Sequence, residues 1–233
     1  MKPTPGKVVA ALFIPVLLYL TYIAACQGLA DIYYRPVKNI IERWQQEKVV
    51  LKDEDWDRLQ QKLETALRFD PDNPDINHAY GTVLQGRYID LFPEDPVAQP
   101  ARRLAADYYR LAIKRRPTWP YTWADLALMK YRLGELDEEY SHALHTAIQM
   151  GPWEPSVQYM VGFLGFQTWD KLGQKDRAFI IKVIQDSFSH ADGGHVGRML
   201  KLTEEYGFLH IFCTLGSDNE RLVKYCNRQL KTN

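Results

Sequence analysis

The sequence predicts an all-helical protein, in which one N-terminal apolar helix is followed by antiparallel helix pairs that stack into an array. Residues 108–152 predict the array because helix-length runs alternate there with turn residues at regular intervals. The apolar helix is predicted because residues 8–30 carry no charge. With 233 residues and a hydrophobic fraction of 46%, the chain can bury a core of the size that such an array needs.

The clearest repeat signal is the spacing of Ala105, Tyr109, Ala112 and Pro117. In the second helix of a tetratricopeptide repeat, small and large residues typically alternate at this spacing, and a proline follows where the helix ends. Two antiparallel helices approach closely only where a side chain is small. We therefore expect a tetratricopeptide-like array, with Ala105 and Ala112 at helix contacts.

The next repeat follows immediately. Trp123 and Leu126 occupy the large-residue positions of a first helix, and Gly134 marks the turn after it. A second helix is expected over residues 136–149, ending at Gly151 and Pro152.

Before this centre, the apolar periodicity predicts a pair formed by residues 36–50 and 53–69, and then a helix over residues 77–91. The proline-rich segment FPEDPVAQP, residues 92–100, lengthens one repeat to 46 residues between Pro71 and Pro117, against 35 between Pro117 and Pro152. Such an insertion usually emerges as a loop on one face, where it either contacts a partner or serves only as a long connection.

After the centre, residues 155–169 and 176–188 are expected to form another pair that ends at HADGGH, residues 190–195. Short helices over residues 196–206, 209–215 and 219–230 would cover the last apolar face of the array. The expected divisions are a tail and transmembrane anchor over residues 1–33, helix pairs over 34–192 and capping helices over 193–233.

The uncharged run predicts a single membrane span, because about 20 apolar residues cross the hydrocarbon core. Two fates fit the residues: an uncleaved anchor, or a signal peptide whose Ile23-Ala24-Ala25-Cys26 resembles a lipobox and leads to lipidation of Cys26. The run continues past Cys26 through Leu29 and Ala30, which favours the anchor. Lysine and arginine flank both ends, so orientation rests on the short basic tail before the run, which favours a cytoplasmic N-terminus and a periplasmic bulk.

Charge and cysteine usage exclude several functions. A formal net charge of +0 gives no basic excess for nucleic acid, and the cluster Lys114, Arg115 and Arg116 is interpreted as a helix end. The three cysteines lack the spacing of metal ligands. Cys213 and Cys226 would form a disulfide in an oxidising compartment, or otherwise remain buried free thiols.

Two segments, RPTWPYTWADLA at residues 116–127 and GPWEP at residues 151–155, resemble VpsP-type polysaccharide-biosynthesis proteins of Gram-negative bacteria. ADIYYRP, residues 30–36, is similar to the juxtamembrane segment of that family. The resemblance runs from about Leu29 to Tyr225 and departs from the family at Cys26. It implies a membrane-tethered, tetratricopeptide-like accessory protein of exopolysaccharide synthesis, with no catalytic residues to carry over.

No motif for catalysis or cofactor binding is recognised, so we expect no enzyme activity, cofactor or metal. His142 and His145 share a helix without a third ligand at matching spacing, and His190 and His195 flank two glycines in a loop. The acidic cluster Glu135, Asp137, Glu138 and Glu139 is interpreted as a helix start. An alternative, a glycan-modifying enzyme using Glu138 or Asp192, lacks a second carboxylate at a recognisable spacing.

The first helix of each pair lines the concave face of a tetratricopeptide array, so partners are expected there. That reasoning gives a partner-binding groove, which would hold a peptide or contact a glycan, formed by Tyr121, Ala124, Leu128, Tyr131, Arg132, Gln158 and Tyr159. Trp119, Trp123 and Trp153 are interpreted as packing residues between pairs.

These observations lead to one functional hypothesis: a non-catalytic scaffold held at the bacterial inner membrane, whose groove binds protein subunits of an exopolysaccharide (biofilm matrix) synthesis or export machinery. The alternative is an assembly factor or subunit of another bacterial membrane complex, for secretion or respiration.

Overall fold

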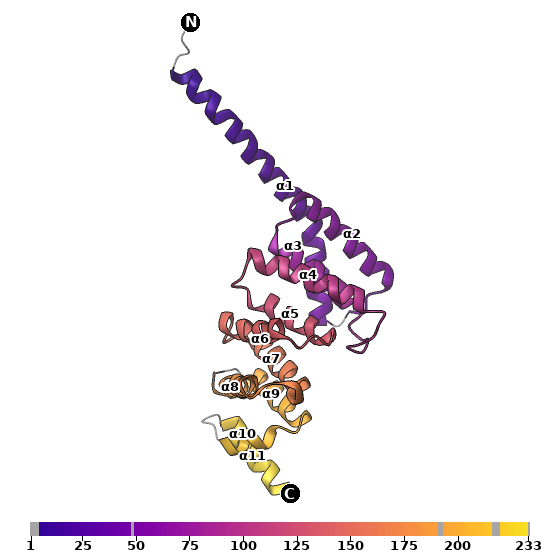
Figure 1. Ribbon diagram of the computed structural model, residues 1–233, viewed down its shortest axis with the longest axis vertical. Coiled ribbons are helices and arrows are strands. Elements are labelled where there is room, and N and C mark those ends of the chain that lie inside the picture. The colour runs from indigo at the N-terminus through magenta and orange to yellow at the C-terminus, as the bar shows by residue number, and fades with distance from the viewer. Residues whose placement is uncertain (1–4, 48, 191–192, 216–219, 233) are drawn as a thin grey trace. The chain divides into compact units, whose positions relative to one another are not determined.

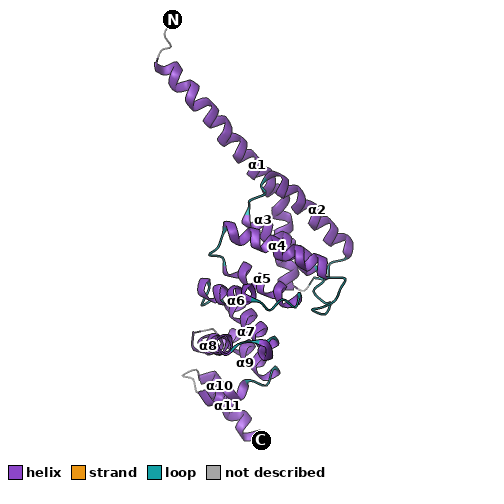
Figure 2. Cartoon of the chain, in the orientation of Figure 1, coloured by secondary structure: helices purple, strands orange, loops and turns teal. Residues whose placement is uncertain are grey.

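The structure is a computed structural model that describes residues 5–47, 49–190, 193–215 and 220–232. The described residues form helices joined by turns and loops, with no strand among them (Figures 1 and 2). The chain divides into two compact units, residues 1–89 and 90–233. Each unit is described by itself.

The first unit begins with α1, an unbroken helix from Pro5 to Glu47 (Figure 1). The sequence predicts a break between an anchor and the first helix of the array, but α1 runs through the expected domain boundary at residues 33–34. Pro36, expected in a first turn, lies inside α1 together with Pro15. Proline is tolerated there at the cost of one backbone hydrogen bond. The predicted span and the first helix of the array are therefore one element.

Two shorter helices complete this unit, α2 from Asp53 to Phe69 and α3 from Pro74 to Gly86. The end of α1 packs against α2 through Val37 and Ile41, which are buried, as are Leu59 and Leu63 of α2. The side chain of Asn73 caps α3 by accepting from the backbone N–H groups of Asp75 (3.0 Å) and Ile76 (3.3 Å). This cap explains why α3 begins three residues before the predicted start.

The second unit holds the remaining helices. They are α4 (Gln99–Arg115), α5 (Pro120–Arg132), α6 (Glu138–Met150), α7 (Pro155–Gln167), the 3-10 turn η1 (Trp169–Lys171), α8 (Gln174–His190), α9 (Gly193–Glu205), α10 (Leu209–Leu215) and α11 (Glu220–Thr232). Each helix packs against the next, and α5 also packs against α7. The predicted tetratricopeptide-like order of first and second helices is confirmed in the pairs α5/α6 and α7/α8.

Small residues form the helix contacts within these pairs. Ala124 and Ala127 on α5 and Ala143 and Ala147 on α6 are at most 4% exposed. On α7, a Cβ added to Gly165 would lie 2.6 Å from side-chain carbons of Ile180 on α8. The helices therefore approach to a distance at which only glycine fits at this position.

Most predicted helices exist, with ends shifted by a few residues. The turn at Gly134 is confirmed and has φ of +73°, a conformation that favours glycine. The turn expected at HADGGH falls partly on residues 191–192, outside the described residues, and α9 already includes Gly193 and His195. Asn219, the expected start of the last helix, also lies outside them.

The C-terminal helices α10 and α11 are joined by a disulfide between Cys213 and Cys226, whose Cα atoms lie 5.6 Å apart. The bond links residues 13 apart in the sequence. Phe212 of α10 also packs against Phe188 of α8, with ring centroids 5.7 Å apart. These contacts hold the end of the chain against the last helix pair.

Candidate functional site

One cleft in the second unit lies where the proline-rich insertion meets the C-terminal ends of α5 and α7. Its volume is about 340 Å³. It is lined by Phe92, Pro93, Glu94, Tyr131, Gly134, Leu136, Gln167, Thr168 and Lys171. Apolar side chains, a phenol, an amide and two opposite charges therefore face one space. We call this space the cleft.

A buried arginine holds the insertion in place. Arg102 of α4 is 1% exposed, and its guanidinium donates to the backbone carbonyls of Leu91 (3.1 Å), Phe92 (3.0 Å) and Pro93. Burial lowers the pKa of Arg102, as does the nearby charge of Arg132, whereas Asp95 raises it. The hydrogen bonds to these carbonyls replace the hydrogen bonds to water that the guanidinium loses on burial. Phe92, which is 84% exposed, is thereby presented on a fixed backbone.

Gln99 fixes the insertion to α5. Its side-chain amide donates to the carbonyl oxygens of Pro93 (3.1 Å) and Arg132 (3.2 Å). Because Arg132 ends α5, one side chain joins the insertion to the helix that carries Tyr131. The relative position of Phe92 and Tyr131 is therefore set by hydrogen bonds as well as by packing.

Tyr131 and Gln167, which also line the cleft, belong to a chain of hydrogen bonds. The Tyr131 hydroxyl donates to the side-chain carbonyl of Gln167 (3.0 Å), and the Gln167 amide donates to the Tyr206 hydroxyl (2.5 Å). Burial raises the pKa of the Tyr131 hydroxyl above its usual value. These hydrogen bonds join α5 and α7 to Tyr206, the residue that directly follows α9.

A charged network underlies the turn between α5 and α6. Lys130 is 3% exposed, and its ammonium contacts Asp137 (2.6 Å), Glu135 (2.9 Å) and Glu139 (3.3 Å). Burial alone would lower the pKa of Lys130, but the three carboxylates outweigh it and raise the pKa. Arg110 of α4 also binds Glu139 through two hydrogen bonds, of 2.7 and 2.8 Å. The network fixes the turn that forms one edge of the cleft.

The predicted groove residues separate into three groups. Tyr131 lines the cleft. Leu128 (6% exposed), Ala124 (4%) and Gln158 (3%) are interior, which corrects their assignment to an open groove. Gln158 instead donates to the carbonyl of Pro152 (2.7 Å), and its own side-chain oxygen lies 2.9 Å from Nε2 of the buried His195.

Tyr121, Arg132 and Tyr159 are half-buried and do not line the cleft. The hydroxyl of Tyr121 donates to the carboxylate of Glu154, linking the start of α5 to the start of α7. The sequence-based groove therefore identifies one residue of the cleft. It misses Phe92, Pro93, Gln167 and Lys171, and the only sequence signal for any of them is the insertion itself.

The three tryptophans were interpreted as packing residues, and two of them are exposed. Trp119 is 39% and Trp153 is 59% exposed. Trp123 is half-buried: its indole N–H donates to the Pro117 carbonyl (2.7 Å), and its ring meets His142 edge-on at 5.3 Å. The packing interpretation therefore fits Trp123 alone.

The histidine pair on α6 is divided between two structural contacts. Nε2 of His145 lies 2.8 Å from the carboxylate of Asp176, and its ring stacks on Phe179 at 3.8 Å. His142 contacts Trp123 instead. Within the described part of the chain, no group of three or more histidine, cysteine, aspartate or glutamate side chains is placed to hold a metal ion.

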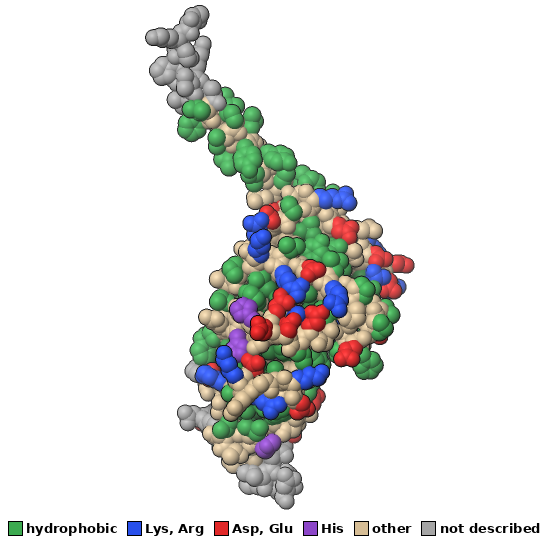
Figure 3. Space-filling view, in the orientation of Figure 1, with side chains coloured by type: hydrophobic (Ala, Val, Ile, Leu, Met, Phe, Trp, Pro, Cys, Tyr) green, Lys and Arg blue, Asp and Glu red, His purple; other side chains and the backbone are tan. Residues whose placement is uncertain are grey.

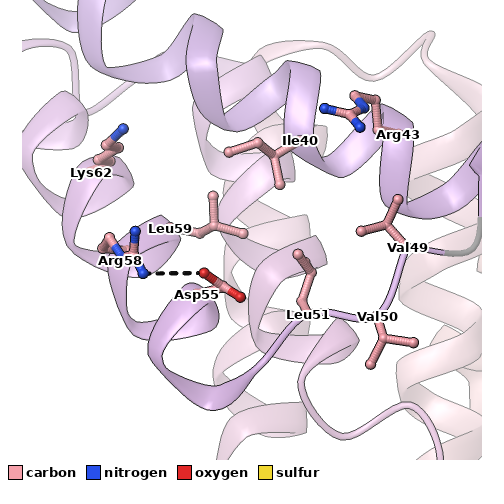
Figure 4. Close-up of a pocket in the computed structure, with 9 residues that line it drawn as sticks. All are labelled: Ile40, Arg43, Val49, Val50, Leu51, Asp55, Arg58, Leu59 and Lys62. Atoms are coloured by element: carbon pink, nitrogen blue, oxygen red, sulfur yellow. Dashed lines mark hydrogen bonds and ion pairs between the residues drawn. The ribbon is translucent and has the colours of Figure 1, made fainter.

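A second pocket, of about 290 Å³, lies in the first unit between the end of α1, the connection to α2 and α2 itself (Figure 4). Its apolar lining comes from Ile40, Val49, Val50, Leu51 and Leu59. Its arginines have acidic partners: Arg58 bonds to Asp55 (3.3 Å) and Arg43 to Glu47 (3.2 Å). Lys62 also lines this pocket.

The first part of α1 presents a different kind of surface. Side chains such as Leu12, Phe13 and Leu18 are 61–67% exposed, and Figure 3 shows hydrophobic side chains around this segment. The helix is long and apolar enough to cross a membrane, and its apolar stretch is not buried against the rest of the described chain. A signal sequence has the same properties, whereas a buried core helix does not.

Comparison with known proteins gives little further guidance. No protein-family model matches the chain, and no curated protein matches it. One solved structure to which it is similar is the crystal structure of MamA protein, at 13% identity and a TM-score of 0.27, covering 77% of this chain and 94% of that one. So remote a likeness supports no inference about function, and none of these findings supports the VpsP-type resemblance.

Proposed function

We propose that the protein is a non-catalytic scaffold, tethered to a membrane by α1, that binds a segment of a partner protein in the cleft. The observation that carries the proposal is that exposed Phe92, on a backbone held by Arg102, lines one cleft with Tyr131 and Gln167. Phe92, Pro93 and Leu136 suit an apolar side chain, and Gln167 with the Tyr131 hydroxyl suits a peptide backbone. Aromatic side chains on fixed backbones are the usual anchors of protein interfaces.

The tether is proposed to be an uncleaved anchor. Its support is the exposed apolar surface of α1, which continues beyond Cys26 and leads without a break into the helix that packs on α2. A tethered binding site meets membrane partners at a raised effective concentration, so weak contacts suffice. We accordingly place the protein in a bacterial inner membrane as a single-pass protein, with lipidation of Cys26 as the alternative.

The bulk of the chain is proposed to lie on the periplasmic side. The disulfide between Cys213 and Cys226 supports this orientation, because disulfides persist in oxidising compartments and are rare in the cytosol. The short basic tail before the apolar run agrees with it.

The proposed partners are protein subunits of an exopolysaccharide synthesis or export machinery. The support is the resemblance of residues 116–127 and 151–155 to VpsP-type proteins. Another membrane machine, for secretion or respiration, would use the same tether and cleft. The glycan-modifying alternative gains no support, since Glu138 is exposed in the first turn of α6 and Asp192 lies outside the described residues.

Purification of the full-length tagged chain from the membranes of its host, followed by mass spectrometry, tests the proposal. Phe92→Ala and Tyr131→Ala should each lower recovery of the partner about 10-fold, since a buried interface anchor is worth 1–2 kcal/mol or more. Val97→Ala is the matched control, because Val97 is 68% exposed in the same insertion but does not line the cleft. Recovery of the partner at the wild-type level with Phe92→Ala and Tyr131→Ala, as with Val97→Ala, would refute binding in the cleft. Recovery of a secretion or respiratory complex would refute the polysaccharide assignment alone.

A further inference from the structure

The pocket of the first unit combines an apolar lining with an open side. We call it the α1/α2 pocket. Ile40 of α1 and Leu59 of α2 contribute apolar surface from the two helices, and Leu51 contributes it from the connection between them (Figure 4). Its volume of about 290 Å³ lies at the lower end of the range for ligand pockets, about 300–1,000 Å³. The pocket therefore suits a single apolar side chain better than a large cofactor.

Cations outnumber carboxylates in the lining of this pocket. Arg43 lies on the α1 side, and Arg58 and Lys62 lie on the α2 side (Figure 4). Asp55, the carboxylate in the lining, accepts from Arg58 (3.3 Å) and from the backbone N–H that precedes α2 (3.1 Å). Arg43 donates to Glu47 through Nε (3.2 Å). Further N–H donors therefore remain on both arginine side chains, which are 67% and 68% exposed.

Lys62 adds a charge that no other group offsets. Its ammonium has no hydrogen bond or ion pair with any residue that the structure describes. Because the two arginines are each matched by one carboxylate, Lys62 leaves the pocket with an excess of positive charge. An anionic ligand would complement that excess.

The connection between the helices exposes backbone groups at the edge of the pocket. Residues 49–51 are not helical, and Val50 is 89% exposed. The backbone N–H and C=O groups of Val50 and Leu51 make no hydrogen bond to another described residue. An extended peptide forms hydrogen bonds with such groups through its own backbone.

We propose that the α1/α2 pocket binds an acidic segment of a partner protein, in which an apolar residue has a glutamate or aspartate two positions before and two positions after it. Residues two apart in an extended chain face the same side, about 6.5 Å from each other. The apolar side chain would enter between Ile40, Leu51 and Leu59. The flanking carboxylates would meet Arg43 on one side and Lys62 on the other.

An anionic membrane lipid fits the pocket less well. At 1.5 Å per residue, Ile40 and Arg43 lie about 15–20 Å further along α1 than Ala30, the last residue of the uncharged run. The headgroup region extends only about 5–8 Å beyond the hydrocarbon core. This choice of peptide over lipid rests on the tether in the proposed function, whereas the pocket itself shares no residue with the cleft.

The test measures the binding of dye-labelled nonapeptides to the full-length chain in phosphatidylcholine nanodiscs by fluorescence anisotropy. One peptide contains the sequence EGLGE, and matched peptides contain QGLGQ, EGGGE or KGLGK at the same place. Wild-type protein should bind the EGLGE peptide at least about 5-fold more tightly than each of the others, because only this peptide offers both the apolar side chain and the carboxylates. Added salt should weaken the binding of EGLGE more than that of QGLGQ.

Substitutions in the pocket should affect the two peptides differently. Lys62→Gln and Arg43→Gln should each weaken EGLGE binding about 3-fold, as expected for one exposed ion pair, and leave QGLGQ binding unchanged. Leu51→Ala should weaken the binding of both peptides, because both carry the leucine. Circular dichroism of each variant checks that the helices are retained.

Two control variants separate the pocket from other surfaces. Lys38→Gln removes an exposed lysine of α1 that does not line the pocket, and Phe92→Ala changes the cleft. Both should bind the EGLGE peptide as wild type does. If EGLGE binds as expected and Phe92→Ala still recovers the cellular partner at the wild-type level, the cleft is refuted and the pocket stands.

Three results would overturn the proposal. The first is equal affinity of the wild-type chain for EGLGE and QGLGQ, which includes binding of neither. The second is EGLGE binding that none of Lys62→Gln, Arg43→Gln and Leu51→Ala changes. The third is tighter binding of dihexanoyl phosphatidylglycerol than of EGLGE, lost in Lys62→Gln, which would assign the pocket to a lipid.

Discussion

At the scale of single residues, glycine positions show how closely the helices pack. Gly165 lies where α7 meets Ile180 of α8, and a Cβ there has no space. Gly197, on the exposed face of α9, has no neighbouring atom within 4 Å of such a Cβ. The two residues are alike in the sequence, and only the three-dimensional packing distinguishes them.

Gly165→Ala should lower the free energy of unfolding by about 1–3 kcal/mol, because the added methyl overpacks a tight contact. Gly197→Ala should raise it by about 0.5–1 kcal/mol, since alanine favours helix at an open position. Thermal unfolding followed by circular dichroism measures both. A shift of the same sign in the two variants would contradict the close approach of α7 and α8.

At the scale of elements, the Lys130 network joins α4, α5 and α6. A hydrogen bond from Lys130 lowers the pKa of Glu135, and one from Arg110 lowers that of Glu139. Burial opposes the shift at Asp137, but hydrogen bonds from Lys130 and from the backbone still leave its pKa lowered. Carboxyl groups whose folded pKa lies below the unfolded value, about 4, stabilise the fold above that pH.

Stability should therefore fall as the pH drops from about 4 through the lowered pKa values of these carboxyls. Lys130→Met removes the shared cation and should lower the free energy of unfolding at pH 7 by about 2 kcal/mol. The difference between wild type and variant should shrink as the carboxyls become protonated. Urea unfolding at pH 7 and pH 3 measures it, and a difference independent of pH would contradict the role of the network.

The elements were largely predictable because they depend on local sequence: apolar periodicity, proline at helix starts and Gly134 at its turn are visible in the chain. The cleft was not, because it depends on contacts between distant residues. Arginine on a helix is usually exposed, yet Arg102 is buried and donates to the carbonyls of Leu91 and Phe92. Gln158 reads as a groove residue, yet its partner His195 is 37 residues away.

At the scale of the whole chain, the first of two compact units begins with the apolar helix α1, and a disulfide joins α10 to α11 in the second. The sequence predicts the membrane span. It allows Cys213 and Cys226 to be either a disulfide or two buried free thiols. Length and hydropathy alone do not distinguish an anchor from a signal sequence, nor do they reveal that α1 continues into the first unit. The fate of α1 and the state of the cysteines are therefore the properties to measure in cells.

Cys26→Ser tests the mode of attachment. If α1 is an uncleaved anchor, the variant should stay in the membrane fraction after alkaline carbonate extraction, in the same amount as wild type. A shorter mature wild-type chain that starts at a lipid-modified Cys26, together with a Cys26→Ser variant that keeps its full length, would show lipidation instead. Cys213→Ser is the companion control for compartment: it should expose Cys226 to a thiol reagent that leaves the wild-type pair unmodified without reductant.

The central claim, a tethered scaffold that holds a partner in the cleft, is tested most directly by site-specific photo-crosslinking in living cells. A photoreactive amino acid at Phe92 or Lys171 should give one shared adduct, identified by mass spectrometry as a membrane subunit of polysaccharide synthesis or export. The same amino acid at Val97, exposed but outside the cleft, should not give it. Absence of an adduct at both cleft positions, or an equal yield at Val97, would contradict the account.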